Sequence, residues 1–243
     1  MVTKNQVKYI QSLSHKKFRD EEAVFVAEGP KVVAELLSMP YMKVKELYGT
    51  ADWWSFAPQR KTEPGSVEVT DSELERLSFL KTPNQVLAIF YKPDLVVVPG
   101  GWQLLLDGIQ DPGNLGTIIR IADWFGVEQI VCSEDCADAF NPKVVQSTMA
   151  SIGRVEIIYT DLVEYVKAHA HRDFLAATLG GTPMKEVKIH GPSSLVIGNE
   201  SRGIRPELMQ HLKHFVTIPR TGAAESLNAA VATGILLSQL KEA

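Results

Sequence analysis

The chain has 243 residues, of which 45% are hydrophobic and 22% are charged, a composition that excludes disordered and collagen-like proteins. No stretch approaches the roughly 18 continuous apolar residues that a membrane-spanning helix needs, and the start of the chain has no apolar run typical of a signal peptide. We therefore expect a cytoplasmic protein. The net charge of -4, taken alone, argues against a nucleic-acid partner, because binding to phosphates depends on Lys and Arg.

The first part of the chain alternates apolar runs with helical patterns. Strands are predicted over residues 23–29, 44–50 and 85–92, and helices over 30–38 and 71–77. Thr70 and Glu73 have the spacing of a capping box, which predicts that a helix starts there. A boundary is predicted at Pro99-Gly100-Gly101, so we expect two domains, residues 1–98 and 99–243.

The second part repeats the alternation with longer units. Strands are predicted over residues 102–109, 128–133, 154–160, 173–179, 193–199 and 214–219, and helices over 114–126, 142–150, 161–170, 205–212 and 225–241. The strands are almost continuously apolar, which is typical of a parallel sheet covered on both faces. Both parts therefore belong to the α/β class.

Three loops that follow strands are rich in Gly, Asn, Pro and Ser: residues 107–117, 198–206 and 218–228. In an open α/β sheet, ligands bind at the carboxyl ends of the strands, so these loops are the expected site. The glycine-rich fingerprint of dinucleotide-binding domains and the phosphate loop with Lys-Ser/Thr are both missing from the sequence. Gly113 and Gly116 form a Gly-x-x-Gly, which is only a weak signal for an RNA clamp.

Cysteine and metal chemistry contribute little to the prediction. Cys132 and Cys136 are four residues apart at the end of a predicted strand, which matches neither a zinc knuckle nor a redox pair. We expect both to be packing residues in a reducing compartment. No cluster of His, Asp, Glu or Cys has metal-ligand spacing, so no metal is expected.

At the three loops the sequence resembles the SpoU (TrmH-like) family of SPOUT methyltransferases. The first motif is LLLDGIQDPGNLGTIIRIADWFGV, the second is SLVIGNESRGIRPEL and the third is IPRTGAAESLNAAVATGILL. All three are long and in the family's order. A fainter resemblance, in KYIQSLSHKKFRDEEAVFVAEGPKVVAELL, is to the small substrate-binding domain often fused ahead of the catalytic domain.

The resemblance implies transfer of a methyl group from S-adenosylmethionine (AdoMet) to a ribose 2′-hydroxyl of RNA. It also implies a small N-terminal α/β/α sandwich and a C-terminal parallel-sheet SPOUT domain with a deep trefoil knot, through which members form homodimers. Ribosomal RNA is favoured over transfer RNA, by analogy with the ribosome-targeted members that the N-terminal domain resembles. A base-nitrogen methyltransferase of the same fold and a non-catalytic RNA-binding protein are the alternatives.

The resemblance also implies roles for individual residues. The expected cofactor-binding residues are Leu179, Gly198, Ile218 and Leu227. The expected catalytic residues are Asn114, Arg120, Glu200, Ser226 and Asn228.

Several of these residues have plainer interpretations. Asn114 and Ser226 are both favoured types for capping the helix that follows, whereas Asn228, two residues further in, is disfavoured inside a helix and so favours an active-site role. Glu200 is interpreted either as part of a structural ion pair or as a charge that complements the sulfonium or holds an arginine. Gly198 is either a turn glycine or a point of close ligand approach.

Arg120 is the family's proposed general base, yet a guanidinium is a poor proton acceptor near neutrality. We favour an Arg120 that binds the phosphate beside the target ribose and polarises the 2′-hydroxyl; a surface ion pair is the alternative.

The only clearly basic segment is the first twenty residues. Within it Lys16, Lys17 and Arg19 are predicted to lie in a loop and to contact the RNA backbone, a solvated surface being the alternative. For Trp53 and Trp54, core packing is favoured over base stacking.

Overall fold

The computed structural model describes residues 1–63, 65–95, 100–188, 191 and 193–241. These residues form two compact units, which are described separately. The first consists of residues 1–94 and 138–153, and the second of residues 95–137 and 154–243. The predicted boundary between residues 98 and 99 lies outside the described residues.

The first unit has a mixed four-stranded sheet in the order β1-β4-β2-β3. Its strands are β1 (Val24–Glu28), β2 (Val44–Gly49), β3 (Ser66–Glu68) and β4 (Val86–Tyr91). β4 runs antiparallel to both neighbours, and β2 and β3 are parallel. The three predicted strands are confirmed. β3 was not predicted, because it has only three residues, none of them buried, and so shows no alternation of apolar and polar residues.

Helices cover both faces of this sheet, as expected for an α/β/α sandwich. The helices are α1 (Lys4–Ser12), α2 (Lys16–Glu21), α3 (Pro30–Ser38), α4 (Ala51–Phe56) and α5 (Asp71–Leu77), with a 3₁₀ helix over Pro58–Thr62. Ile10 of α1 and Leu74 of α5 share one apolar cluster with Val24, Val26 and Leu87 of the strands. Thr70 and Glu73 form the predicted capping box of α5.

A segment from the middle of the chain, residues 138–153, also belongs to the first unit. It contains α7 (Pro142–Thr148) and a 3₁₀ helix over Ser151–Gly153, and α7 lies beside β1. The ring of Phe140 lies 5.3 Å from that of Phe25, centre to centre. A Cβ added to Gly153 would lie 2.7 Å from the sulfur of Met39, so any larger residue there would require the Met39 side chain to move.

The second unit has a six-stranded sheet in which every pairing is parallel, in the order β10-β8-β9-β5-β6-β7. Its strands are β5 (Gln103–Asp107), β6 (Gln129–Cys132), β7 (Glu156–Tyr159), β8 (Asp173–Pro183), β9 (Ser193–Gly198) and β10 (His214–Thr217). All six predicted strands and the predicted parallel sheet are confirmed. These strands could be predicted from the sequence because strands such as β5 and β8 bury consecutive apolar residues.

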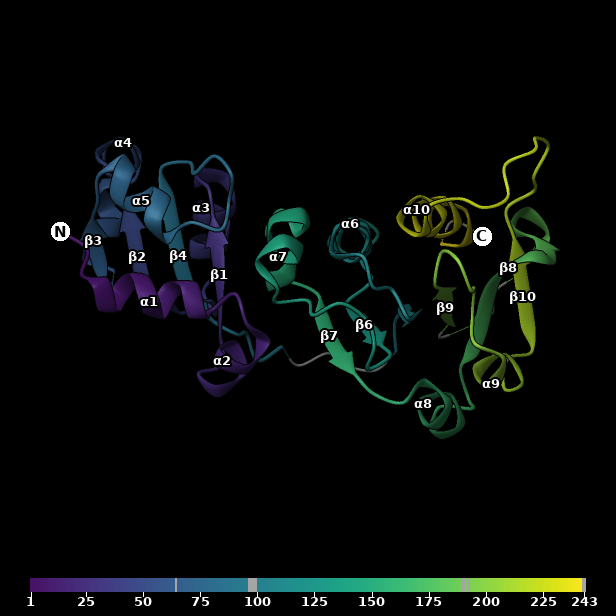
Figure 1. Ribbon diagram of the computed structural model, residues 1–243. Coiled ribbons are helices and arrows are strands. Elements are labelled where there is room, and N and C mark those ends of the chain that lie inside the picture. Colours follow the sequence, from purple (N-terminus) through teal and green to yellow (C-terminus); the bar gives the residue numbers. More distant parts are fainter. Residues whose placement is uncertain (64, 96–99, 189–190, 192, 242–243) are drawn as a thin grey trace. The chain divides into compact units, whose positions relative to one another are not determined.

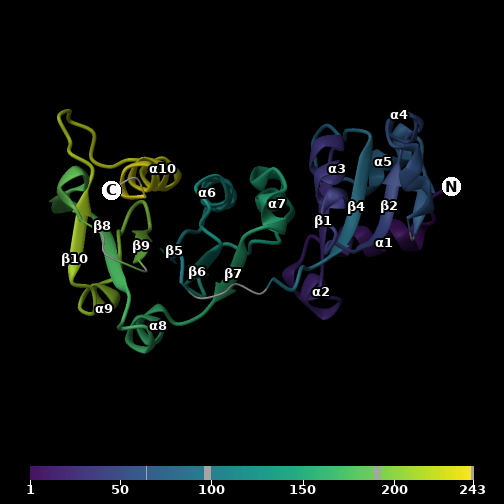
Figure 2. The same ribbon diagram turned by 180° about the vertical axis from the view of Figure 1, so that it is seen from behind.

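Its helices are α6 (Pro112–Trp124), α8 (Leu162–Ala168), α9 (Pro206–Met209) and α10 (Ala229–Leu240), with a 3₁₀ helix over Met184–Glu186. Within this unit, α6 and α10 lie on one side of the strands and α8 and α9 on the other (Figures 1 and 2). Leu162 of α8 and Leu208 of α9 share an apolar cluster with Leu105 and Val196. In the described part of the chain, none of the helices is long and apolar enough to cross a membrane. The trefoil knot stays a prediction.

Candidate active site

Three loops gather at the carboxyl edge of the second sheet. They follow β5, β9 and β10, and Figure 1 shows the third as the yellow loop that leads from β10 to α10. Because the strands are parallel, all of their carboxyl ends lie at the same edge. The structure thus brings the three predicted loops to one side of the sheet.

Asn114 joins the three loops through its side-chain amide. Its Nδ2 donates to Oε1 of Glu200 at 2.5 Å, and its Oδ1 accepts a hydrogen bond from Nδ2 of Asn228 at 2.8 Å. A carboxylate only accepts, so Glu200 fixes which end of the Asn114 amide faces it. Three of the five predicted catalytic residues therefore form one hydrogen-bonded chain.

The capping predictions need correction. Asp111 caps α6, and its carboxylate accepts from the backbone N–H of Asn114 at 2.8 Å, so Asn114 lies within the first turn. Asn228 itself caps α10, because its Oδ1 accepts from the N–H groups of Ala230 and Val231. Ser226 lies before the helix, exposed, and makes no hydrogen bond to the described residues. The expectation that Ser226 caps the helix and Asn228 lies inside it was wrong.

Arg120 is exposed on α6, whereas Ile118, Ile119 and Ala122 around it are buried. Within the described residues its guanidinium has no hydrogen bond and no ion pair, so the surface ion-pair alternative is not supported. The group is free to bind an anion from outside the chain. Glu200 likewise forms no ion pair with Arg120 or Arg202 among these residues.

The second loop is a tight turn held by Asn199. The side chain of Asn199 donates to the carbonyl of Gly108 at 2.8 Å and accepts from the N–H groups of Ser201 and Arg202. A Cβ on Gly198 would lie 2.2 Å from the carbonyl carbon of Gly203, which no side chain tolerates. Gly198 is therefore required by the turn itself, whatever it also offers to a ligand.

An ion pair between buried Asp107 and exposed Arg205 anchors the same loop and was missed in the sequence. Asp107, at the end of β5 and 2% exposed, accepts from Nε of Arg205 at 2.6 Å and from its backbone N–H at 2.7 Å. The hydrogen bond to Asp107 raises the pKa of the Arg205 guanidinium. An acidic residue directly at the end of an apolar strand was the available signal, but its partner is 98 residues away.

The predicted cofactor residues lie at the ends of neighbouring strands. Ile218 follows β10 directly, Gly198 ends β9 and Leu227 precedes α10. In β8 the pairing with β10 jumps from Ala176 to Thr182, so residues 177–181 bulge out of the sheet. Leu179 lies in this bulge with 76% of its surface exposed. The structure therefore places all four residues at the carboxyl edge.

Cys132 and Cys136 are buried free thiols beneath the first loop. Sγ of Cys136 accepts from the backbone N–H of Ile109 at 3.2 Å and donates to the carbonyl of Leu106 at 3.2 Å. Hydrogen bonding, first of all from Cys132, lowers the pKa of Cys136 to about 7. Across the described ranges no group of three or more His, Cys, Asp or Glu side chains is placed to hold a metal ion.

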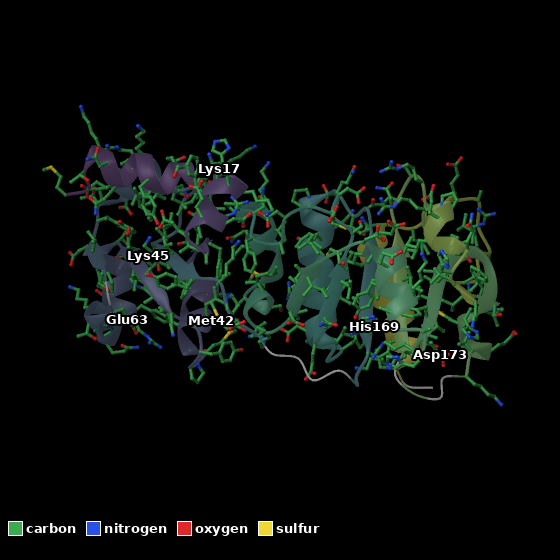
Figure 3. All side chains as sticks on the ribbon, turned by 90° about the horizontal axis from the view of Figure 1, so that it is seen from below. Lys17, Met42, Lys45, Glu63, His169 and Asp173 are labelled. Atoms are coloured by element: carbon green, nitrogen blue, oxygen red, sulfur yellow. The ribbon has the colours of Figure 1, made fainter. Side chains whose placement is uncertain are left out.

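The basic segment differs from its prediction. Residues 16–21 form the short helix α2 rather than a loop. Lys16 and Lys17 are exposed and pair with Asp20 and Glu21; Figure 3 labels Lys17 on this helix. Arg19 is 1% exposed, donates to the carbonyls of Leu13 and Ser14, and forms an ion pair with Asp138.

The prediction that Arg19 contacts RNA is therefore corrected: its guanidinium is used inside the first unit. Trp53 and Trp54 are both buried, which agrees with core packing rather than base stacking.

Comparison with known proteins gives consistent matches. Residues 101–238 match the model of the SpoU rRNA methylase family, and residues 4–88 match the MRM3-like substrate binding domain. The 23S rRNA (guanosine(2553)-2′-O)-methyltransferase RlmP of Bacillus subtilis is 33% identical over 242 residues, covering 98% of this chain and 97% of that protein.

Two solved structures agree over the whole chain. A Porphyromonas gingivalis protein assigned to the TrmH family of RNA methyltransferases is 36% identical with a TM-score of 0.89, and 100% of each chain is covered. An AdoMet-bound rRNA methyltransferase from Sinorhizobium meliloti is 30% identical with a TM-score of 0.87, covering 100% of this chain and 96% of that one. The three sequence motifs, the parallel sheet and these matches agree, and the chain belongs to the SpoU rRNA methylase family.

Proposed function

We propose that this protein transfers a methyl group from AdoMet to a ribose 2′-hydroxyl of ribosomal RNA, and that its target is a guanosine of 23S rRNA. The observation that carries the proposal is the chain Glu200–Asn114–Asn228, which joins the three family motifs through side-chain hydrogen bonds. The predicted enzyme class and cofactor are confirmed by the family match and by the AdoMet-bound relative. The guanosine target is supported by the name of the B. subtilis relative.

The carboxyl edge fits AdoMet. Leu179 and Leu227 leave 76% and 46% of their surface exposed there, which is apolar surface suited to an adenine ring. Ile218 adds a half-buried apolar side chain, and the turn at Gly198 offers backbone groups for polar contacts. When bound, AdoMet supplies an electrophilic methyl group on a sulfonium sulfur.

The residues of this chain position and polarise the RNA. Arg120 binds the phosphate next to the target ribose bidentately and polarises the 2′-hydroxyl, which its guanidinium, exposed and without an ion pair to the described residues, permits. Asn114 is held by Glu200 and Asn228, and the negative charge of Glu200 complements a cationic methyl donor. Ser226 is exposed in the third loop, where a hydroxyl is available to the RNA. Holding the oxygen and the methyl group in line contributes roughly 7 kcal/mol or more to lowering the barrier.

Residues 1–98 act as a substrate-binding domain that recruits the RNA, and residues 99–243 as the catalytic domain. The match of residues 4–88 to a substrate binding domain supports this division. Lys16 and Lys17 are exposed on α2 and contact the RNA backbone.

The protein acts as a homodimer through the second unit, in the cytoplasm. Trp124 of α6 is 85% exposed and Val231 of α10 is 50% exposed, and these two helices pack side by side. Large apolar side chains left in water on adjacent helices favour an isologous contact with a second copy. Light scattering after gel filtration tests this: a Trp124→Arg variant that stays dimeric argues against this surface.

Methyl transfer is tested with labelled AdoMet and either ribosomal RNA or transfer RNA. Alkaline hydrolysis of the product separates the alternatives, because a 2′-O-methylated ribose protects its phosphodiester bond and a methylated base does not. Label in an alkali-resistant dinucleotide from 23S rRNA is expected. Label on a base, label in transfer RNA alone, or AdoMet that is neither bound nor consumed would each contradict the proposal.

A further inference from the structure

A cleft of about 380 Å³ opens at the amino edge of the second sheet, opposite the edge that carries the site described above. Its walls include the first residues of two strands, Asp173 of β8 and His214 of β10, and the end of α8. Figure 3 labels Asp173, the first residue of β8, and His169, the residue directly after α8. Its polar lining residues are Lys167, Arg172, Asp173, His211, Lys213 and His214.

Arg172 in this cleft is a buried cation with no carboxylate partner among the described residues. It is 5% exposed, and its Nε donates to the hydroxyl of Ser194 at 3.1 Å. Its Nη2 donates to the carbonyls of Gly101 and Ser193 at 2.5 and 3.0 Å. All these acceptors are neutral, and no carboxylate pairs with Arg172 in the described ranges. Burial lowers the pKa of the guanidinium, although an arginine stays charged near neutrality.

Among the described residues, none of the other charged side chains of the cleft forms an ion pair with Arg172. Asp173 lies 3.8 Å from His214, and Lys167 is paired with Glu164 at 2.9 Å. Lys213 is exposed and has no ion pair with any described residue. Arg172 and Lys213 therefore form no ion pair with a described carboxylate, and the lining of the cleft holds two such cations against the single carboxylate of Asp173. Because buried charges in proteins are normally paired, an anion from outside the chain is the missing partner.

The cleft continues along the edge of the sheet. Lys213 and His214 also line an adjoining cleft of about 390 Å³, which adds Lys188 and reaches Gly180 and Gly181 of the β8 bulge. β10 is the edge strand there, and the two clefts share Lys213 and His214 in their walls; we call the two together the groove. Two clefts that share Lys213, with Arg172 in one and Lys188 in the other, suit a strand of linked phosphates better than one free ion.

We propose that this groove binds a single-stranded segment of the RNA substrate, with a backbone phosphate held by Arg172 and Lys213. The proposal rests on the proposed function, because it assigns the anion to the RNA that is methylated. The shared chemistry is a phosphate oxyanion, which inorganic phosphate also provides. Arg172 and Lys213 are positioning residues: they act on binding of the RNA at a distance from the transferred methyl group.

The test uses the full chain and an RNA fragment containing the methylated site, with binding followed by fluorescence anisotropy over a range of KCl concentrations. Arg172→Gln is the direct variant, but it alters a buried residue, so Lys213→Glu, at an exposed position, is measured with it. We expect Lys213→Glu to weaken RNA binding by about fivefold or more and to lower the salt slope by about 0.7 for the lost phosphate contact. The KM for RNA rises accordingly, whereas kcat at saturating RNA and the Kd for AdoMet stay unchanged.

Lys185→Glu makes the same charge change at an exposed position outside the groove and should leave the salt slope unchanged. An equal loss in Lys185→Glu, or an unchanged slope in Lys213→Glu, overturns the proposal. Titration with inorganic phosphate alone distinguishes a site for free phosphate from a site for the RNA backbone. If Lys213→Glu loses binding of inorganic phosphate but binds RNA as the wild type does, the proposal is also overturned. These binding measurements do not require turnover, so failure of methyl transfer would contradict the proposed function and leave the groove assignment to its own test.

Discussion

The side-chain amide of Asn114 donates a hydrogen bond to the carboxylate of Glu200, 86 positions later in the chain. This contact fixes the first turn of α6 against the loop that follows β9. The free oxygen of the same amide then accepts from Asn228. An amide is the side chain that meets both requirements, because it donates at one end and accepts at the other.

Asn114→Asp is expected to lower kcat for methyl transfer by about 10²-fold while leaving the fold intact. The substitution keeps the size but loses the donor and places a carboxylate against Glu200. Initial rates with labelled AdoMet and ribosomal RNA measure the effect, and circular dichroism checks the fold. Asn5→Asp, an equal change at an exposed position of α1, should keep full activity. If Asn114→Asp kept it too, the hydrogen-bonded chain would have no role in the reaction.

Arg120→Lys tests how the exposed arginine acts. Lysine keeps the charge but cannot bind a phosphate bidentately, so we expect methyl transfer to fall by about 10²-fold with the Kd for AdoMet unchanged. Single-turnover rates and calorimetric titration with AdoMet measure the two quantities. Arg76→Lys, exposed on α5, is the matched control. Near-full activity of Arg120→Lys would exclude both the bidentate role and the role as a base.

Local patterns in the sequence predicted the elements well. The structure has helices over Pro30–Ser38 and Asp71–Leu77, as predicted, because a proline at the first helical position and a capping box mark their starts. The start of α10 was predicted at residue 225 and lies at Ala229. Ser226 and Asn228 are both good caps, and only the tertiary bond from Asn228 to Asn114 distinguishes them.

Long-range relationships could not be predicted in the same way. The motif resemblance identified the three loops, but the ion pair between Asp107 and Arg205 joins residues with no periodic relation. Arg19 was predicted to be a surface cation, because no residue near it in the sequence indicates an ion pair with Asp138. The sequence also did not predict that residues 138–153 belong to the first unit. That placement depends on long-range packing, such as that of Phe140 against Phe25.

Lys16→Glu/Lys17→Glu should weaken RNA binding and lower the free energy of unfolding by only about 1 kcal/mol, because the ion pairs it removes are exposed. Two exposed cations that contact phosphates contribute a salt slope of about 1.4 on single-stranded RNA, and the double variant should lose it. Anisotropy titrations at several KCl concentrations give the slope. Lys31→Glu, exposed on α3, is the control. A slope that does not change in the double variant would place the RNA elsewhere on the first unit.

Arg19→Ala should lower the stability of the protein and leave its RNA binding unchanged. Its removal leaves the Asp138 carboxylate without its partner and opens a cavity, so the free energy of unfolding should fall by about 3 kcal/mol. Urea denaturation followed by tryptophan fluorescence measures this loss. The salt slope of RNA binding should not change in the folded variant. A stable Arg19→Ala with a reduced slope would restore the role first expected for this residue.

Arg205→Ala should destabilise the second unit by about 3 kcal/mol, because it leaves the Asp107 carboxylate buried and unpaired. Arg202→Ala removes an exposed arginine from the same loop and should stay within about 0.5 kcal/mol of the wild type. Urea denaturation compares the two. Equal stability of the variants would show that the ion pair does not hold the loop.

Glu28 gives the first unit a stability that depends on pH. This carboxylate at the end of β1 is 4% exposed, accepts from the backbone N–H of Phe79 at 2.9 Å and from the Ser78 hydroxyl, and desolvation raises its pKa. An acid with a raised pKa in the folded state contributes stability that is fully present below its unfolded pKa, 4.5, and is lost as the pH rises through the folded value. Glu28→Gln keeps an acceptor for Phe79 and carries no charge, so the stability of the wild type relative to this variant should fall as the pH is raised from about 4.5. Urea denaturation at a series of pH values measures the difference, with Glu75→Gln, exposed on α5, as the control. A difference between wild type and Glu28→Gln that stays constant across the series would mean that Glu28 pays no desolvation penalty when it ionises.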